Sequence, residues 1–173
     1  MNRERITNDF IKMVNISSLS LREKNFATII VMRLERLGFD VTVDDAGEAY
    51  GGDFGNIYGI LRGDSSKKPV LFCAHLDTVS PGENIQPIIK ENMVCTDGST
   101  ILGADDKCGI AAILEAVESI VENGSPHGDI EVLFTIGEEI GMLGSKHFDT
   151  SMIKSKMAFV MDSSGKVGEV IVK

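Results

Sequence analysis

The sequence predicts an α/β domain in which a mixed, mostly parallel central sheet has helices on both faces. Segments with strand and helix patterns alternate along the 173 residues, which is typical of sheets whose strands are joined by helices. Two apolar runs, residues 69–74 and 130–136, have the pattern of strands that are covered on both faces. Apolar residues at helical spacing over 110–121 indicate the longest helix.

The first third of the chain is predicted to contain two helices. Apolar residues at helical spacing indicate a short amphipathic helix over residues 4–15. Ser20 followed by Glu23 matches a capping box that would open a second helix, which Gly38 would close. The next segments are predicted as a strand, a loop rich in glycine and aspartate, and another strand, over residues 39–43, 44–53 and 56–61.

The rest of the chain adds shorter elements around the two apolar runs. Residues 85–95 are predicted to form two short strands about Glu91-Asn92. The long helix follows the stretch 103–109 and ends at Asn123-Gly124. A helix over residues 144–148 and a strand over residues 157–161 complete the prediction.

Composition excludes several classes of partner. Seventeen basic and 26 acidic residues give a formal charge of -9, which argues against nucleic acid because such binding needs clustered lysine and arginine. No apolar run approaches the roughly 18 residues that a membrane span needs, and the N-terminus has no signal-peptide pattern. The wide spacing of Cys73, Cys95 and Cys108 suggests neither a disulfide framework nor a zinc site, so we expect a cytoplasmic protein. Cys73 is expected to be a small buried hydrophobe and Cys108 a helix-packing residue.

Four polar clusters occupy the places where an α/β sheet gathers its functional groups. Three of them follow predicted strands, and the fourth begins the long helix. Functional groups in such sheets lie beyond the carboxyl ends of the strands, so we expect the clusters to meet. They are His75-Leu76-Asp77, Asp105-Asp106, Gly137-Glu138-Glu139 and Asp162.

Each cluster has an ordinary structural interpretation beside the functional one. His75 and Asp77 share a side of an extended backbone, and a carboxylate commonly holds the second nitrogen of a histidine ligand. They could equally form a polar strand end. Asp105-Asp106 could cap the helix, although two acids in a row suggest that one is held by another charge, such as a metal ion.

Glu138 and Glu139 also have both a functional and a structural interpretation. Adjacent side chains diverge, so one of Glu138 and Glu139 can ligate a metal while the other acts as general base on water. The alternative is a surface turn, and an isolated Asp162 would most simply belong to a turn as well. The order and shared location of the four clusters are more specific than any one of them.

Four motifs, in order, resemble those of the co-catalytic zinc exopeptidases, which include peptidase T, glutamate carboxypeptidase and aminoacylase. The stretches 75–82 and 100–107 are most similar to the peptidase T branch. The resemblance covers essentially the whole chain and implies the catalytic-domain fold of that family. The motifs are Ala74-His75-Leu76-Asp77-Thr78-Val79, Gly103-Ala104-Asp105-Asp106-Lys107, Gly137-Glu138-Glu139-Ile140-Gly141 and Met161-Asp162.

The resemblance implies a site for two zinc ions, with cobalt or manganese as replacements. Asp105 would bridge the two ions. His75 and Asp162 would complete the protein ligands of one zinc, and Glu139 would ligate the other. The family members carry a late histidine as the final ligand of the second zinc, so the resemblance implies that this second site is incomplete in the present chain. His127 and His147 are interpreted as surface or structural residues.

The resemblance also implies roles in catalysis. Glu138 would be the general base that deprotonates the bridging water, and Asp77 would orient His75. The peptide bond between Asp105 and Asp106 would be cis, as in the family.

Family members are about twice as long, and the length difference sets expectations for the domains. Residues 1–173 would be the N-terminal part of the catalytic domain. A lid and dimerisation domain and the C-terminal part of the catalytic domain would be absent. We therefore expect this chain alone to be inactive or nearly so, and the full-length protein to be a homodimer through the missing domain.

The expected function is that of a zinc-dependent aminopeptidase of the tripeptidase, peptidase T-like type, which hydrolyses the N-terminal peptide bond of short peptides with a metal-activated water. An amidohydrolase that acts on N-acyl amino acids with the same dizinc site is the first alternative. A non-catalytic metal-binding or interaction module is the second. The presence of Glu138 argues against this second alternative, since mere binding has no use for a general base.

Overall fold

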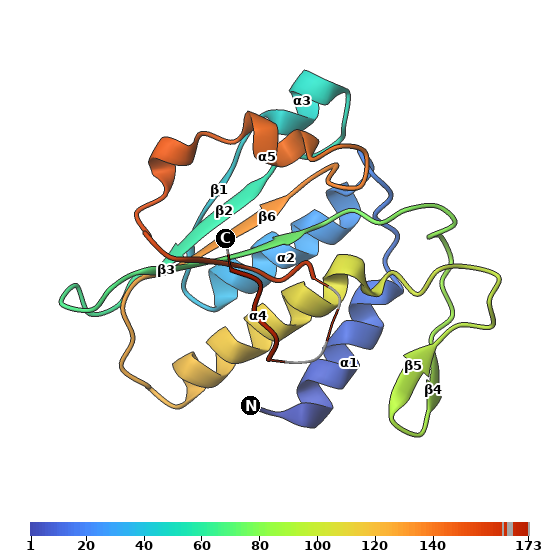
Figure 1. Ribbon diagram of the computed structural model, residues 1–173, viewed down its shortest axis with the longest axis horizontal. Coiled ribbons are helices and arrows are strands. Elements are labelled where there is room, and N and C mark those ends of the chain that lie inside the picture. The colour runs from blue at the N-terminus through green and yellow to red at the C-terminus, as the bar shows by residue number, and fades with distance from the viewer. Residues whose placement is uncertain (164, 166–167, 173) are drawn as a thin grey trace.

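A five-stranded sheet forms the centre of the molecule in the computed structural model, which describes residues 1–163, 165 and 168–172 (Figure 1). The strand order is β1-β2-β6-β3-β7. β2 is antiparallel to both of its neighbours, while β3 is parallel to β6 and to β7. Four of the five strands therefore run in one direction, which confirms the predicted mixed, mostly parallel sheet. The strands are β1 (Asp40–Val43), β2 (Ile57–Leu61), β3 (Val70–His75), β6 (Ile130–Thr135) and β7 (Ala158–Val160).

Three helices cover one face of this sheet, and they contribute most of the core. Their buried apolar residues form one cluster with side chains from β2, β3 and β6 (Figure 1). This periodic burial is what the sequence pattern predicts for amphipathic helices. The helices are α1 (Arg3–Val14), α2 (Lys24–Arg36) and α4 (Ala104–Glu122).

The opposite face has a thinner cover, which comes from the segment after β6. Phe148 packs there against Tyr58, Leu71 and Leu133, with Met152 at the margin. Helices therefore lie on both faces, as predicted. The covering elements are α5 (Leu143–His147) and the 3-10 turn η1 (Thr150–Met152). No helix in the described part of the chain is long and apolar enough to cross a membrane.

A separate two-stranded hairpin stands outside the sheet, formed by β4 (Ile88–Lys90) and β5 (Met93–Cys95). It turns at Glu91, as the sequence predicts, and Glu91 has a positive φ of 50°. Gly38, which follows α2 with a φ of 94°, also agrees with its predicted place after the helix.

Three expectations were wrong. The predicted loop 44–53 contains a short helix, α3 (Ala46–Tyr50), because Asp44 accepts from the backbone amides of Ala46 and Asn56 and so closes the segment on itself. The capping box does not form, since the N-cap residue of α2 is Glu23 and its side chain makes no cap hydrogen bond to the helix. Ser20 and Glu23 bond elsewhere, as described below.

The third wrong expectation concerns Cys108. The sequence suggested a helix-packing residue, but this cysteine is exposed. Cys73 does pack as a partly buried hydrophobe against the smaller core, and burial raises the pKa of its thiol to about 11.

Candidate active site

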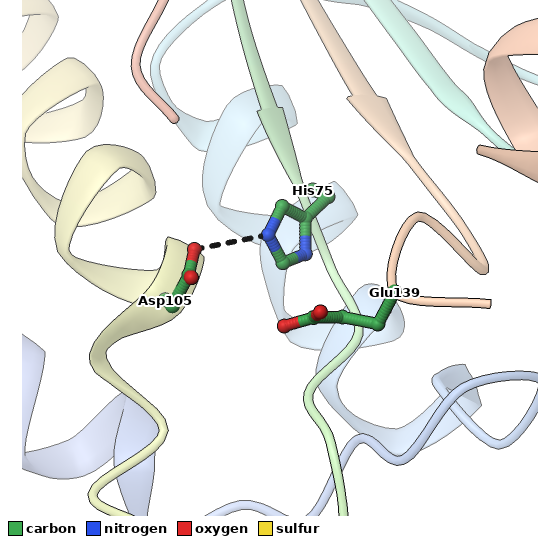
Figure 2. A group of neighbouring side chains, drawn as sticks. All are labelled: His75, Asp105 and Glu139. Carbon is green, nitrogen blue, oxygen red and sulfur yellow. Dashed lines mark hydrogen bonds and ion pairs between the residues drawn. The ribbon is translucent and has the colours of Figure 1, made fainter. Parts of the chain in front are cut away.

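His75 is the last residue of β3 and lies at the carboxyl end of the central strands. Only 2% of its surface is exposed. Its Nε2 atom is 3.2 Å from Oδ1 of Asp105, and its Nδ1 atom is 2.9 Å from the backbone carbonyl of Asp77. Burial acts to lower the pKa of His75, but the surrounding aspartates outweigh burial and raise it to about 9. Figure 2 shows the imidazole between Asp105 and Glu139.

Asp77 is fully buried and connects three segments. Its carboxylate lies 3.4 Å from Nδ1 of His75. It also accepts hydrogen bonds from the backbone amides of Glu138 and Glu139, at 2.8 and 3.2 Å, and from the hydroxyl of Ser20 at 2.6 Å. Burial would raise the pKa of Asp77, but the His75 imidazole, together with the hydrogen bonds from Ser20 and the Glu138 amide, holds it below its usual range. Asp77 thus lies where it can orient the imidazole and the glutamate turn together.

Asp105 and Asp106 lie at a kink at the start of α4 and differ in their surroundings. The peptide bond between them is cis, as the resemblance implies. The Asp105 side chain is 70% exposed and faces His75. Asp106 is buried; one of its oxygens accepts from the Gly109 amide at 3.1 Å, and the other has no hydrogen-bond partner. Burial, together with neighbouring carboxylates, raises the pKa of Asp106 to about 7.

Glu138 and Glu139 lie in the turn that follows β6. Gly137, with a φ of 56°, allows the chain to turn sharply at that point, and the amides of Gly141 and Met142 close the turn on the carbonyl of Glu138. Partial burial, together with neighbouring carboxylates, raises the pKa of both glutamates.

The predicted residues converge into two overlapping groups that could hold a metal ion. One contains His75, Asp105 and Glu139 (Figure 2), and the other contains His75, Glu138 and Asp162. Within each group the ligand atoms lie within 4.8 Å of one another. Histidine nitrogen and carboxylate oxygen are ordinary ligands for zinc. The resemblance makes Asp105 the shared residue, whereas His75 is the residue that these two groups have in common.

The charge of this region is unbalanced. We define the site cluster as His75 with the six carboxylates of Asp77, Asp105, Asp106, Glu138, Glu139 and Asp162. Within the described residues, no lysine or arginine forms an ion pair with any of the six. Lys107 follows directly in sequence, but its ammonium donates to the carbonyl of Ile16 at 2.6 Å and lies 4.6 Å from the centre of the Phe26 ring. The site cluster therefore fits a bound cation.

The other two histidines lie outside both groups, in agreement with their predicted structural roles. Nδ1 of His127 is 2.7 Å from the carbonyl of Gly128. His147 pairs with Asp45 at 2.8 Å and contacts the ring of Tyr50.

Sequence reasoning missed the contribution of Ser20 and Glu23. Ser20 donates to Asp77, and Glu23 accepts from the amide of Gly137 at 3.0 Å. The only signal in the sequence was the Ser-x-x-Glu spacing, which has a local explanation as a helix cap.

Histidine and carboxylates gathered at the carboxyl ends of the central strands form a candidate metal site, and comparison with known proteins gives its class, a hydrolase of the peptidase type. The Peptidase family M28 model matches residues 56–172, and the chain belongs to this family.

Individual relatives agree with the predicted resemblance to peptidase T. The chain is 39% identical to YqjE of Bacillus subtilis, over 99% of this chain and 46% of that protein. It is 31% identical to Peptidase T of Listeria monocytogenes, over 97% of this chain and 50% of the relative. The chain thus spans about half the length of these relatives.

Two solved structures of similar proteins also match nearly all of this chain and a little under half of their own length. The aminopeptidase PepT from Bacillus cereus superposes with a TM-score of 0.97 at 38% identity, over 99% of this chain and 46% of that one. A tripeptidase from Staphylococcus aureus gives a TM-score of 0.93 at 34% identity, over 97% of this chain and 45% of that one. The predicted resemblance and fold class are therefore confirmed.

Proposed function

We propose that residues 1–173 form the N-terminal part of the catalytic domain of a zinc-dependent aminopeptidase of tripeptidase type. The proposed reaction is hydrolysis of the N-terminal peptide bond of short peptides. Similarity to an aminopeptidase and to a tripeptidase supports this substrate class. The observation that carries the proposal is the convergence of His75 with Asp105, Glu138, Glu139 and Asp162 at one edge of the sheet.

The metal ligands in this proposal are those that the family resemblance implies. Asp105 would be a ligand of both zinc ions, His75 and Asp162 would hold one of them, and Glu139 would hold the other, for which the resemblance implies a further histidine. Cobalt or manganese could replace zinc at ligands of this kind. When bound, zinc supplies a Lewis acid and lowers the pKa of a water molecule. The unbalanced negative charge of the site cluster supports the presence of divalent cations.

Glu138 is the proposed general base. It takes the proton from the attacking water and returns it to the leaving amine. In the metal-free protein, partial burial and nearby carboxylates raise the pKa of Glu138 above its usual range.

Asp77 is proposed to orient His75. In this proposal Nδ1 of the imidazole is protonated and donates a hydrogen bond to the Asp77 carbonyl, 2.9 Å away. Nε2 then keeps its lone pair and faces Asp105. Such a hydrogen bond fixes the tautomer of a histidine ligand.

The cellular setting belongs to the same proposal. Three free cysteines fit a reducing compartment such as the cytoplasm. The partner is a short peptide, and the charge of -9 disfavours nucleic acid. Assembly into a homodimer would depend on parts of the full-length protein beyond these residues.

Replacement of the general base tests the proposal in the full-length protein. Glu138→Ala should reduce tripeptide hydrolysis by at least about 100-fold and leave the zinc content unchanged. Glu83→Ala, at an exposed glutamate, is the control and should retain activity. Loss of zinc from Glu138→Ala would mean that the roles of the two glutamates are exchanged.

The substrate assay also separates the alternatives. Hydrolysis of N-acyl amino acids in preference to tripeptides would indicate an amidohydrolase. Zinc binding with neither activity would indicate a non-catalytic module. Either result would contradict the proposed function.

A further inference from the structure

The connector between α1 and α2, residues 15–23, lies against the candidate site. Leu19 forms a parallel bridge with Thr78, and the Thr78 amide donates to the carbonyl of Ser18 at 2.9 Å. These contacts hold the connector beside the segment that carries His75 and Asp77. The connector precedes residue 56, where the Peptidase family M28 match begins.

Ser20 is the first of two connector residues that reach the site. Its hydroxyl donates to Oδ2 of Asp77 at 2.6 Å, and the same oxygen accepts from the Glu139 amide at 3.2 Å. The other oxygen of Asp77 accepts a hydrogen bond from the Glu138 amide and faces the imidazole of His75. Because Asp77 has several competing donors, the Ser20 hydroxyl helps to fix the angle at which its carboxylate meets each of them.

Glu23 is the second connector residue that reaches the site. It is fully buried, and a single oxygen accepts from the amides of Leu21 at 2.8 Å and Gly137 at 3.0 Å. Gly137 directly precedes Glu138 and Glu139, so this bond ties the base of the glutamate turn to the connector. A glutamate without exposed surface is unfavourable in a protein interior, and no lysine or arginine within the described residues forms an ion pair with it. Its observed contacts are those that hold the connector and the turn together.

We propose that Ser20 and Glu23 are positioning residues for the candidate metal site. Ser20 acts through Asp77 on the imidazole of His75, and Glu23 acts through the Gly137 amide on the two glutamates. The inference rests on the proposed function, because it assumes that these side chains serve a metal. Residues that hold metal ligands in place typically contribute about 10–100-fold to metal affinity or activity.

The remote end of α4 offers a matched control. Ser119 also donates its hydroxyl to a buried carboxylate, that of Glu115, at 2.9 Å. Glu115 is 1% exposed and accepts backbone and side-chain hydrogen bonds from α1. Ser119→Ala therefore removes a comparable hydroxyl–carboxylate hydrogen bond from a part of the molecule that is not the site.

The test is a zinc titration of the full-length protein against a chromophoric chelator, with zinc-free thermal unfolding measured in parallel. Ser20→Ala should weaken zinc binding about 10-fold, while Ser119→Ala leaves it unchanged despite a similar change in Tm. Glu23→Met should weaken binding by up to about 100-fold. Glu23→Gln keeps an oxygen acceptor for both amides and should stay within about 3-fold of wild type.

The outcomes distinguish this inference from the proposed function. Unchanged zinc affinity in Ser20→Ala and Glu23→Met would overturn the positioning roles while the proposed function stands. If Glu23→Met does not fold, then Ser20→Ala decides alone, and wild-type affinity in that variant overturns the inference. Wild-type protein that binds zinc but hydrolyses no peptide would overturn the proposed function, and the titration would still decide the roles of Ser20 and Glu23. Wild-type protein that binds no zinc would overturn both.

Discussion

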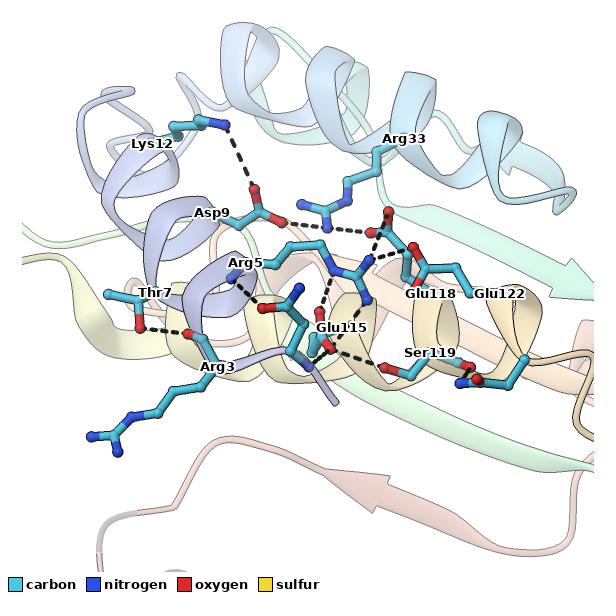
Figure 3. Close-up of polar contacts among 12 residues, drawn as sticks. Arg3, Arg5, Thr7, Asp9, Lys12, Arg33, Glu115, Glu118, Ser119 and Glu122 are labelled. Atoms are coloured by element: carbon cyan, nitrogen blue, oxygen red, sulfur yellow. Dashed lines mark hydrogen bonds and ion pairs between the residues drawn. The ribbon is translucent and has the colours of Figure 1, made fainter.

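Carboxylates are concentrated in two regions of the molecule. The regions differ in whether arginine side chains pair with these carboxylates. The helix network joins α1, α2 and α4 and consists of Arg5, Asp9, Arg33, Glu115, Glu118 and Glu122 (Figure 3). Each of its four carboxylates has an arginine nitrogen within 3.7 Å. The site cluster has six carboxylates and His75, and no arginine or lysine of the described residues pairs with them.

The difference appears in the pKa values. In the helix network, the Arg5 guanidinium lowers the pKa of Glu115 to about 2. In the site cluster, burial and like charges raise the pKa of Glu138, Glu139 and Asp106. A paired carboxylate stabilises the folded protein as an anion, whereas an unpaired one resists ionisation. The first region therefore serves the fold, and the second is arranged to receive cations.

The largest effect is expected when the helix network loses its central cation. Arg5→Met leaves the buried Glu115 carboxylate without its partner, so the free energy of unfolding should fall by more than the loss of an exposed ion pair would cost. Urea denaturation measures the change. Lys12→Met removes an ammonium 3.9 Å from Asp9 on a side chain that is 77% exposed, and it should cost less than about 1 kcal/mol. Equal losses in the two variants would mean that the network is only a surface feature.

His75→Ala should have the next largest effect, on zinc binding. His75 belongs to both groups of candidate ligands, so its loss should weaken zinc affinity by more than the roughly 100-fold that outer residues contribute. His147→Ala removes a histidine that pairs with Asp45 and contacts Tyr50. Calorimetric titration should find wild-type affinity in that control. A small effect of His75→Ala would show that the carboxylates alone hold the metal.

The pH dependence of zinc-free stability should separate the regions further. Glu115 has a folded pKa of about 2 against its usual 4.5. Its stabilisation is therefore complete above pH 4.5 and is lost as the pH falls toward 2. Asp106 has a folded pKa of about 7 against its usual 3.8, so the folded state binds the proton more tightly and stability falls as the pH rises from 3.8 to 7.

Two substitutions separate the contributions of Glu115 and Asp106 to the change of stability with pH. Glu115→Gln should flatten the stability profile between pH 2 and 4.5. Asp106→Asn should flatten it between pH 3.8 and 7 and should raise zinc-free stability at pH 7 by at least about 1 kcal/mol. Thermal unfolding in a pH series provides the data. A profile that Asp106→Asn leaves unchanged would contradict the view that the site cluster carries uncompensated charge.

The sequence predicted most of the sheet and the membership of the site cluster, for a physical reason. Strand and helix periodicity identify the elements locally, and parallel strands bring their carboxyl ends to one edge. His75, Glu138, Glu139 and Asp162 follow three such strands, so their convergence needed no knowledge of long-range contacts.

The features that the sequence did not predict depend on distant partners. Ser20 bonds to a residue 57 positions away, and Glu23 bonds to one 114 positions away. The three-residue spacing of Ser20 and Glu23 had a sufficient local explanation as a helix cap, although the hydrogen bonds of that cap do not form. The helix network was missed for the same reason, since Arg5 and Glu115 are 110 positions apart.

Zinc analysis of the 173-residue chain tests the central claim most directly. After equilibrium dialysis against zinc and removal of loosely bound metal, the chain should retain one ion, at the proposed site of His75, Asp105 and Asp162. The retained ion should raise Tm, since it binds only the folded state. A chain that retains no zinc and shows no change in Tm would contradict the account.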